Sequence, residues 1–492
     1  MTLVKNMALL FCTLSACIFG AALSGAENII KKPCGLVSLD KKDKCFDKLS
    51  TSATGDATQK DLSFQVSAGA SSYKPVNIQA LCVGQNKDLE ALANIVKFDL
   101  DFTDQLLVDI KRIDKIPNEK NVKEFAKYKK TIEKLFNDET SLCMYFRLAV
   151  PKQDKLKKFV NITIKDTSSD ESVFDRTFSY ADASLIFDAH SISQAIIPVL
   201  TGQDGICLSS FAFCKQLSSK KKVICITDYM CKKEKIIVPH CGINVAPRWH
   251  SQAGYLFYSQ FLRASCQLVS LNIKNKTEKI ICSYDGLNMQ PSFSPDGIQV
   301  ALCMSGGGEN SELYLYDQRV CKQLKKRVFK QITKNKGNNS SPCLLPNGDI
   351  VFCSDFQTGS PQLYYYRKLD GRTVRLSSGV GYSAAPSYSE ANNAIAYTRL
   401  VNKTFQLFTM SFTEHGVVEK QCTFGSGDKL DATWSPCGRY IAFTYDHKNE
   451  KTNKMIPQIG VLNCRSGNIR VLTHSKFPKS FPCWSANPYF QL

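Results

Sequence analysis

The chain has 492 residues, of which 43% are hydrophobic and 22% are charged. This composition is typical of folded globular protein with room for more than one core, and it excludes a largely disordered chain. The formal net charge of +19 favours acidic partners, but the lysines are not clustered in a way that indicates nucleic-acid binding, and we expect none.

The first 26 residues have the pattern of a secretory signal peptide. Lys5 supplies one positive charge, residues 7–23 are apolar, and small residues lead to a cleavage site between Ala26 and Glu27. The sequence therefore predicts that the mature protein begins at Glu27 and is exported.

A second interpretation of the N-terminus stays open. The run Leu14-Ser-Ala-Cys17 resembles the lipobox of bacterial lipoproteins, in which the cysteine is acylated. Apolar residues continue past Cys17, which favours cleavage after Ala26 instead. A lipidated Cys17 would anchor the chain, with the propeller predicted below, in the outer membrane, with a diverged protein partner.

Two segments follow the signal peptide. Residues 27–60 are polar and are predicted to form a flexible arm, whereas residues 61–202 have the alternating pattern of a small α/β domain. The strands predicted for this domain cover residues 62–66, 76–83, 141–150, 159–165 and 172–179, and the helices cover residues 89–100, 121–137 and 183–200.

Residues 203–492 repeat one pattern six times. A strand with an aromatic or Leu residue is followed by a turn and by an apolar strand, and the best copy reads Pro291-Ser-Phe-Ser-Pro-Asp-Gly297. The shared position falls at Trp249, Phe293, Leu344, Tyr388, Trp434 and Trp484, with spacings of 44, 51, 44, 46 and 50 residues. A period of 40–50 residues built from strands and turns predicts a β-propeller with six blades.

The two ends of this segment are incomplete in complementary ways. Three strands, at residues 211–213, 223–226 and 236–238, precede Trp249 without a first strand of their own. At the other end, Pro482-Cys-Trp-Ser485 is a first strand without followers. We therefore predict that the C-terminal strand completes the first blade and closes the ring, which removes exposed sheet edges.

The cysteines and histidines do not form a recognisable metal or redox motif. The chain has 21 cysteines but no Cys-x-x-Cys, and its six histidines lack metal-ligand spacing, so we predict no metal and no cofactor. Cys225, Cys303, Cys353 and Cys483 lie at strand positions and are predicted to be buried packing thiols. Cys34 and Cys45, in the polar arm, are candidates for a disulfide, and the connectivity stays open.

These features together resemble the TolB family of the bacterial Tol-Pal system. The resemblance rests on four segments: the blade motif of residues 291–297, the junction from His190-Ser-Ile-Ser to Leu200-Thr-Gly202, the run Thr227-Asp-Tyr229, and the ending Phe481-Pro-Cys-Trp-Ser485. It implies an α/β N-terminal domain followed by an all-β six-bladed β-propeller, closed by the C-terminal strand.

The resemblance also implies a binding protein with two partners. Proteins of this family bind the peptidoglycan-associated lipoprotein Pal through the propeller mouth and the inner-membrane protein TolA through the N-terminal region, and so support outer-membrane integrity and constriction at cell division. Such a protein associates with the outer membrane through its partners, and we expect a monomer. The positions that match the Pal-binding loops are Leu287, Asn288, Met289, Gln290, Asn338, Asn339, Ser340, Ser341, Tyr382, Ser383 and Ala384.

An enzymatic alternative comes from serine peptidases with similar propeller blades. Their hydrolase domain carries a Gly-x-Ser-x-Gly nucleophile elbow, and this chain has no such motif. Only seven residues follow Ser485, too few for a hydrolase domain at that end. We therefore predict that the chain has no catalytic residues and is not an enzyme.

Overall fold

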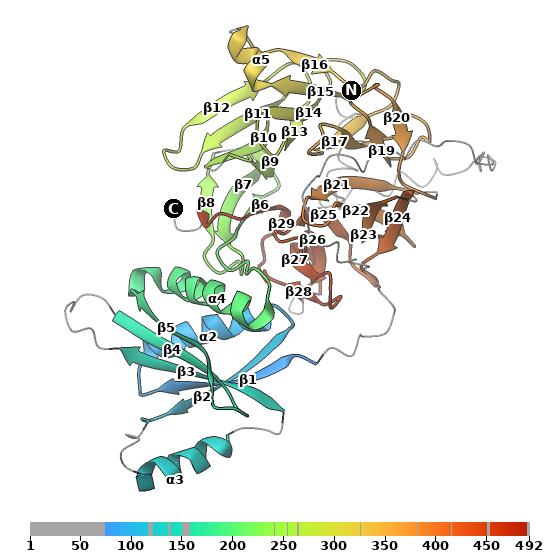
Figure 1. Ribbon diagram of the computed structural model, residues 1–492. Coiled ribbons are helices and arrows are strands. Elements are labelled where there is room, and N and C mark those ends of the chain that lie inside the picture. Colours follow the sequence, from blue (N-terminus) through green and yellow to red (C-terminus); the bar gives the residue numbers. More distant parts are fainter. Residues whose placement is uncertain are drawn as a thin grey trace. The chain divides into compact units, whose positions relative to one another are not determined.

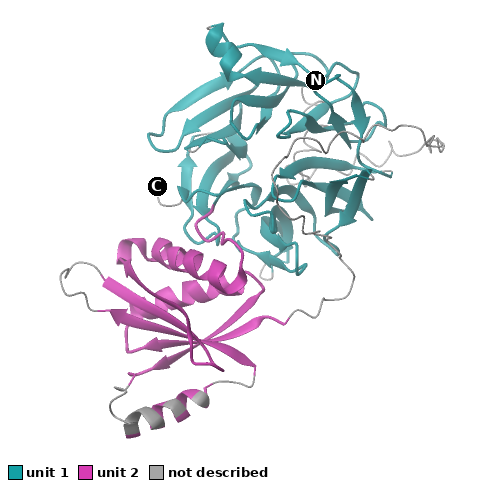
Figure 2. Ribbon diagram, viewed as in Figure 1, with its two compact units in different colours: residues 1–65, 210–490, 492 teal, residues 66–209, 491 magenta. Residues whose placement is uncertain are grey.

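The computed structural model describes residues 74–116, 122–135, 139–149, 158–240, 242–252, 254–262, 265–324, 326–379, 381–414, 416–449 and 453–489. The chain divides into two compact units between residues 209 and 210 (Figure 2). The predicted signal peptide, the predicted polar arm and the strand predicted at residues 62–66 lie outside the described residues.

The N-terminal unit contains a mixed five-stranded sheet and three α-helices (Figure 1). The strand order is β2-β1-β3-β4-β5, in which β1 runs parallel to β2 and β3, whereas β3, β4 and β5 are antiparallel to one another. Its main elements are β1 (Val76–Val83), α2 (Lys87–Asp101), β2 (Leu106–Ile113), α3 (Val122–Glu133), β3 (Thr140–Ala149), β4 (Lys158–Asp166), β5 (Ser172–Tyr180) and α4 (Leu185–Thr201).

Strand β2 is absent from the sequence-based predictions. It lies at the edge of the sheet, where buried Leu106 and Val108 alternate with exposed Leu107 and Asp109. The short run with one buried face gives a weak apolar signal, because three of its eight residues are charged. Its parallel pairing with β1 completes the sheet.

Helix α4 is a core helix of this unit. It buries Ile192 and Ile196 and packs on α2, and it ends where Gly202 adopts a left-handed conformation with φ of 67°. Its His190 Nδ1 lies 2.9 Å from Asp99 Oδ2 of α2, and both side chains are fully buried. Among the described residues, the segment Asp182–Thr201 is the one helix with the length and apolar composition of a membrane span. The buried contact between His190 and Asp99 and the packing on α2 favour a core role for it.

The C-terminal unit consists of short antiparallel sheets arranged around a centre (Figure 1). Four sheets have four strands each: β13–β16, β17–β20, β21–β24 and β25–β28. The remaining eight strands form two further groups of four, β29 with β6–β8 and β9–β12, which are joined through one pair of residues, Lys222 and Ile243. Each group is called a blade below, and the first strands of the blades are β29, β9, β13, β17, β21 and β25.

The strand bounds follow the predicted repeat. The first strands are β29 (Lys479–Ser485), β9 (Ile243–Trp249), β13 (Asn288–Phe293), β17 (Asn339–Leu344), β21 (Ser383–Ser389) and β25 (Lys429–Trp434). The second strands are β6 (Ser210–Ser218), β10 (Tyr255–Phe261), β14 (Gln299–Met304), β18 (Ile350–Ser354), β22 (Ala394–Val401) and β26 (Tyr440–Lys448). The third strands are β7 (Lys221–Asp228), β11 (Cys266–Asn272), β15 (Glu312–Asp317), β19 (Gln362–Tyr366), β23 (Thr404–Thr413) and β27 (Met455–Asn463). The fourth strands are β8 (Lys235–Val238), β12 (Glu278–Cys282), β16 (Phe329–Gln331), β20 (Thr373–Arg375), β24 (Gly416–Gln421) and β28 (Ile469–Val471), and a short helix, α5 (Gln318–Gln323), precedes β16.

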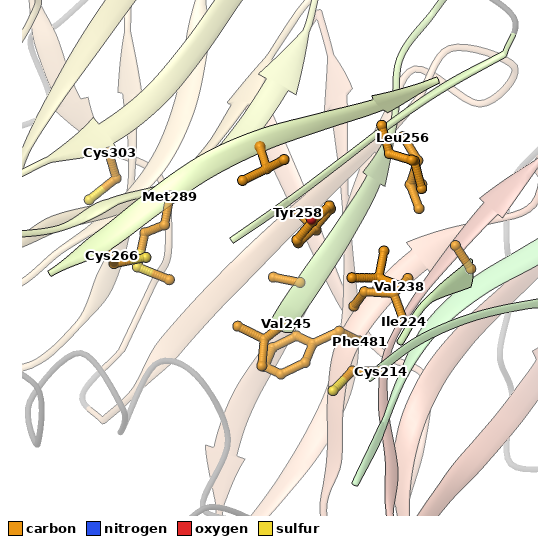
Figure 3. Packing of buried hydrophobic residues seen from close by; sticks show 14 of the residues in the cluster. Cys214, Ile224, Val238, Val245, Leu256, Tyr258, Cys266, Met289, Cys303 and Phe481 are labelled. Atoms are coloured by element: carbon orange, nitrogen blue, oxygen red, sulfur yellow. The ribbon is translucent and has the colours of Figure 1, made fainter. Parts of the chain in front are cut away.

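The C-terminal strand, β29, pairs with β6, the strand with which the sequence of this unit begins. β29 lies antiparallel to β6, with Trp484 opposite Phe211 and Ser485 opposite Ser210. The rings of Trp484 and Phe211 lie 4.4 Å apart between centroids. Phe481 of β29 lies beside Val245 of β9 (Figure 3), in a core cluster that extends from blade β29/β6–β8 through β9–β12 to blade β17–β20. The pairing predicted for the C-terminal strand is therefore present.

An ion-pair clasp reinforces this closure. Lys479 of β29 stands directly opposite Lys215 of β6, and Glu234 lies between the two ammonium groups. Glu234 accepts hydrogen bonds at 2.6 Å from Lys479 Nζ and at 2.7 Å from Lys215 Nζ. One carboxylate thus bridges two like charges and offsets their repulsion across the closing strand pair.

The cysteines serve packing, as the sequence predicts. Cys225, Cys303, Cys353 and Cys483 are all buried, and every described cysteine is a free thiol. Burial raises the pKa of Cys303 and of Cys353 to about 12, so these thiols stay protonated and unreactive at neutral pH. Cys34 and Cys45 lie outside the described residues.

Candidate functional site: the channel and rim of the propeller

One residue in each first strand has a left-handed backbone. These six residues have φ between 49° and 56°, and none is glycine: Ala246, Gln290, Ser341, Ala385, Asp431 and Phe481. Each lies where the pairing between the first and second strands shifts register. A left-handed conformation costs a residue with a β-carbon about 1 kcal/mol or more. Six equivalent bulges at one level therefore indicate that the packing of the ring maintains this backbone conformation in every blade.

The residues after these bulges connect neighbouring blades. Five of the six bulged residues precede proline, which lacks an N–H donor, and Ala432 takes that place in β25. The backbone N–H of Leu344 donates to Ser292 Oγ at 2.9 Å, and that of Trp434 donates to Ser387 Oγ at 3.4 Å. In the same way, Trp249 Nε1 donates to the carbonyl of Cys483 at 3.0 Å. The shared aromatic position of the repeat is thus used to bind one blade to the next.

A cavity of about 460 Å³ lies inside the ring of first strands. Residues of all six first strands line it, from the bulged residues to the turns that follow, such as Pro295 and Pro346. Prolines and aromatic rings make up much of its wall, and hydroxyl groups of Ser341 and Ser387 are interspersed among them. The cavity therefore occupies the half of the channel nearest the turns between first and second strands.

Three charged or titratable groups of the wall differ in environment. Asp431 is almost fully buried and accepts a hydrogen bond at 2.8 Å from Thr444 Oγ1, and its burial raises the pKa of the carboxyl to about 6. Burial lowers the pKa of His250, although its Nε2 lies 3.0 Å from the carbonyl oxygen of Gly297. Arg248 is half-buried and hydrogen-bonds to the carbonyl of Pro247 at 3.0 Å.

The positions matched to the Pal-binding loops lie at the opposite end of the first strands. Because a first strand runs from these positions toward the cavity-side turn, only Gln290 and Ser341 among them line the cavity. Eight of the eleven side chains are buried: Leu287, Asn288, Met289, Gln290, Asn339, Ser340, Ser383 and Ala384. Asn338, Ser341 and Tyr382 are half-exposed.

The buried members have structural partners. Asn288 Nδ2 donates to the carbonyls of Cys266 and Tyr284, at 2.8 and 2.6 Å. Asn339 Nδ2 donates to Glu312 Oε2 at 2.9 Å. Gln290 Oε1 accepts a hydrogen bond at 2.8 Å from the N–H of Ser341 in the next blade. These polar residues satisfy backbone and side-chain groups inside the ring, as buried polar groups must.

Two of the half-exposed members, Asn338 and Tyr382, border the propeller rim, whereas Ser341 lines the cavity. The backbone N–H of Asn338 donates to Asp355 Oδ1 at 2.7 Å, which fixes the loop before β17. The Tyr382 ring packs edge-on against Phe405, with 5.3 Å between centroids. Side chains held in this way present a pre-organised surface on two neighbouring blades.

Sequence reasoning did not identify Arg248 and Asp431 as channel residues. An alignment of the six repeats could have identified them, because both residues occupy positions within the motif at which the other blades have uncharged side chains. No group of three or more potential metal ligands of the His, Cys, Asp or Glu type occurs within the described ranges.

The comparisons with known proteins agree on one family. A family model described as the TolB beta propeller domain matches residues 198–488, more than half of the chain. The chain is 26% identical over 308 residues to the Tol-Pal system protein TolB of Francisella tularensis subsp. mediasiatica, covering 60% of this chain and 69% of that protein. The TolB of F. tularensis subsp. holarctica is 24% identical over 310 residues, with the same coverage.

A solved structure extends the similarity of fold to both units. TolB from Acinetobacter baumannii superposes with a TM-score of 0.68 at 20% identity, covering 84% of this chain and 96% of that one. At this identity the likeness concerns the fold alone. The family match, the blade pattern and the closing strand lead to the same conclusion: the chain belongs to the TolB β-propeller family.

Proposed function

We propose that the chain is a non-catalytic periplasmic adaptor of the Tol-Pal system. In this proposal the propeller binds a Pal-like lipoprotein and the N-terminal region binds a TolA-like inner-membrane protein. The protein then supports outer-membrane integrity and constriction at cell division. Membership of the TolB family and relatives named as Tol-Pal system proteins support this role.

The observation that carries the proposal is the fixed rim ahead of β17 and β21. Asn338 and Tyr382 are held by contacts within the ring, so a partner would meet a surface that needs little ordering on binding. The buried members of the matched set, such as Asn288 and Asn339, contribute by holding these loops in place. Ser341 and Gln290 lie deeper, at the level of the bulges.

Two variants at opposite ends of neighbouring strands test this surface. Tyr382→Glu places a charge on the proposed rim, just before β21. Leu369→Glu is a matched control, because Leu369 is 90% exposed in the turn between β19 and β20, at the opposite end of the neighbouring blade. Leu369 is exposed, whereas Tyr382 is partly buried against Phe405, so tryptophan emission is used to check that both variants are folded before capture.

The experiment is affinity capture from solubilised cell envelopes, with the immobilised mature chain and identification by mass spectrometry. The proposal predicts recovery of a Pal-like lipoprotein by the unmodified chain and by Leu369→Glu, and a loss of at least tenfold for Tyr382→Glu. Recovery that is equal for all three chains would reject the proposed rim. Absence of any Pal-like lipoprotein with the unmodified chain would reject the Tol-Pal assignment.

A lipidated form is the second candidate, and it rests on the run Leu14-Ser-Ala-Cys17. The intact mass of the protein purified from cells separates the two forms. A polypeptide that begins at Glu27 supports cleavage by the ordinary signal peptidase, whereas a mass with an acylated Cys17 at its start supports an outer-membrane anchor. A serine-directed activity probe should not label the protein, and labelling would contradict the non-catalytic role.

A further inference from the structure

Arg248 interrupts a pattern of short side chains around the channel. It lies two residues after the bulge of β9, and the equivalent residues of the other first strands are Ser292, Cys343, Ser387, Thr433 and Cys483. Three of these short side chains accept an N–H from the next blade. A guanidinium group is far longer than this contact requires.

The charge of Arg248 acts across the channel. It favours the ionised forms of Cys343, Asp431 and Cys483, which belong to three different blades. Nevertheless, Arg248 forms no ion pair with any carboxylate in the described part of the chain, and its one hydrogen bond to an oxygen goes to the adjacent Pro247 carbonyl. Its side chain also lies within hydrogen-bonding reach of the Cys483 thiol. A guanidinium has five N–H donors, so donors beyond these two contacts remain available to a molecule in the cavity.

The walls define the rest of such a molecule. Pro291, Phe293, Pro342, Leu344 and Tyr388 line the same cavity and offer apolar surface. The volume of about 460 Å³ is within the range of sites for small organic ligands. An apolar body of roughly one ring would therefore find packing partners next to the guanidinium.

Arg248 is the one arginine or lysine among the described residues of the lining, and the acidic groups nearby limit the negative charge that a ligand on its guanidinium can carry. Asp431 and Glu390 also line the cavity, so one guanidinium is accompanied by two carboxyl groups. A dianionic phosphate would be repelled by the carboxylates, whereas one carboxylate can form a bidentate pair with Arg248. A cationic ligand would be repelled by the guanidinium of Arg248.

We propose that the channel binds a small organic monocarboxylate, with its carboxylate on the guanidinium of Arg248 and its apolar body against the proline and aromatic walls. This site is separate from the rim proposed for the protein partner, because it lies at the other end of the first strands. The inference therefore goes beyond the adaptor function and does not depend on it.

Isothermal titration calorimetry of the purified mature chain tests the site, with benzoate as the probe. The proposal predicts saturable binding of one benzoate per chain, at least tenfold weaker binding of phenyl phosphate, and no binding of benzylamine. Arg248→Gln should weaken benzoate binding at least tenfold, and Arg248→Lys should give an intermediate affinity. Arg372→Gln is the control, because Arg372 lies in an exposed turn, its side chain is 69% exposed, and the exchange should leave the affinity unchanged.

The folding of each variant is checked by comparing its tryptophan emission with that of the native chain, since Trp249 stands next to Arg248. Saturable benzoate binding that survives Arg248→Gln in a folded protein would overturn the proposal, and so would equal binding of benzylamine. Absence of any benzoate binding would also overturn it. In that case, loss of partner capture in Arg248→Gln would assign the guanidinium to an acidic side chain of the protein partner.

Discussion

The clasp at Glu234 predicts how strongly the closing strand depends on one carboxylate. Glu234 bridges Lys215 and Lys479, whose side chains are 18% and 6% exposed, and its own side chain is 20% exposed. Glu234→Gln preserves the shape of the side chain but removes its charge. Two ammonium groups on directly paired strand positions then face each other without a counter-charge.

The magnitude follows from burial. Removal of one partner from a fully buried ion pair costs about 3–5 kcal/mol, whereas an exposed pair contributes less than about 1 kcal/mol. The clasp lies between these limits, so we expect the free energy of unfolding to fall by roughly 2–3 kcal/mol. The double variant Glu234→Gln/Lys479→Met should recover part of this loss, because one ammonium group, that of Lys215, is then left without its counter-charge in place of two.

Urea unfolding followed by tryptophan emission measures this effect in the propeller unit alone. All three tryptophans, Trp249, Trp434 and Trp484, belong to that unit. With a denaturant dependence of about 3 kcal/mol per M, the midpoint should fall by roughly 0.7–1 M. The control Glu414→Gln, at an exposed position, should change the free energy of unfolding by less than about 0.5 kcal/mol.

The pH dependence gives an independent check. Burial by itself would raise the pKa of Glu234, but the hydrogen bonds and charges of Lys215 and Lys479 lower it overall. The stabilisation from the clasp is therefore present above the ordinary carboxyl pKa of 4.5 and is lost as the pH falls below it. If Glu234→Gln were no less stable than Glu414→Gln at pH 7, the electrostatic explanation of closure would be refuted.

Three further predictions concern the channel. Ala385→Gly should raise the free energy of unfolding by about 0.5–1 kcal/mol because φ is 55° at this position, whereas Ala384→Gly at the neighbouring buried position should lower it by about 1 kcal/mol. If urea unfolding showed the two exchanges to change stability in the same direction, strain at the bulge would be contradicted. Asp431→Asn should raise the free energy of unfolding by about 2–3 kcal/mol at pH 7.5 and change it little at pH 4. The reason is that burial raises the carboxyl pKa from 3.8 to about 6, so the native chain loses stability as the pH rises from 3.8 through 6. An unchanged pH profile of stability in the variant would exclude a buried carboxylate. Gly297→Ala should lower the melting temperature by several degrees, since a β-carbon there would lie 2.6 Å from His250 Cε1 at a φ of +69°; a neutral exchange would contradict the turn geometry.

The sequence predicts the ring well because each blade repeats its local chemistry. The turn residues and the aromatic position recur in register, and the unmatched strands near Phe211 and Trp484 indicate how the ends meet. The clasp could not be predicted in the same way. Glu234 and Lys479 are 245 residues apart, and their proximity follows only from the completed pairing of β29 with β6.

The candidate site shows a different limit. Asn288 and Asn339 resemble exposed loop residues in sequence, because asparagine is common in turns. In the folded ring they are fully buried and donate hydrogen bonds to strands of the preceding blade, at Cys266 of β11 and Glu312 of β15. Arg248 and Asp431 owe their positions to left-handed bulges in the first strands. Ala246 and Asp431 lie at such bulges, and neither residue type predicts a left-handed backbone.

The closing strand is the feature on which the rim and the channel both depend. Hydrogen–deuterium exchange of the native chain, resolved for peptides covering residues 479–485 and 210–218, measures its pairing most directly. The account predicts that both peptides exchange together and as slowly as the central strands of the other blades. Exchange of residues 479–485 within seconds, while residues 210–218 stay protected by β7, would contradict a ring closed by β29.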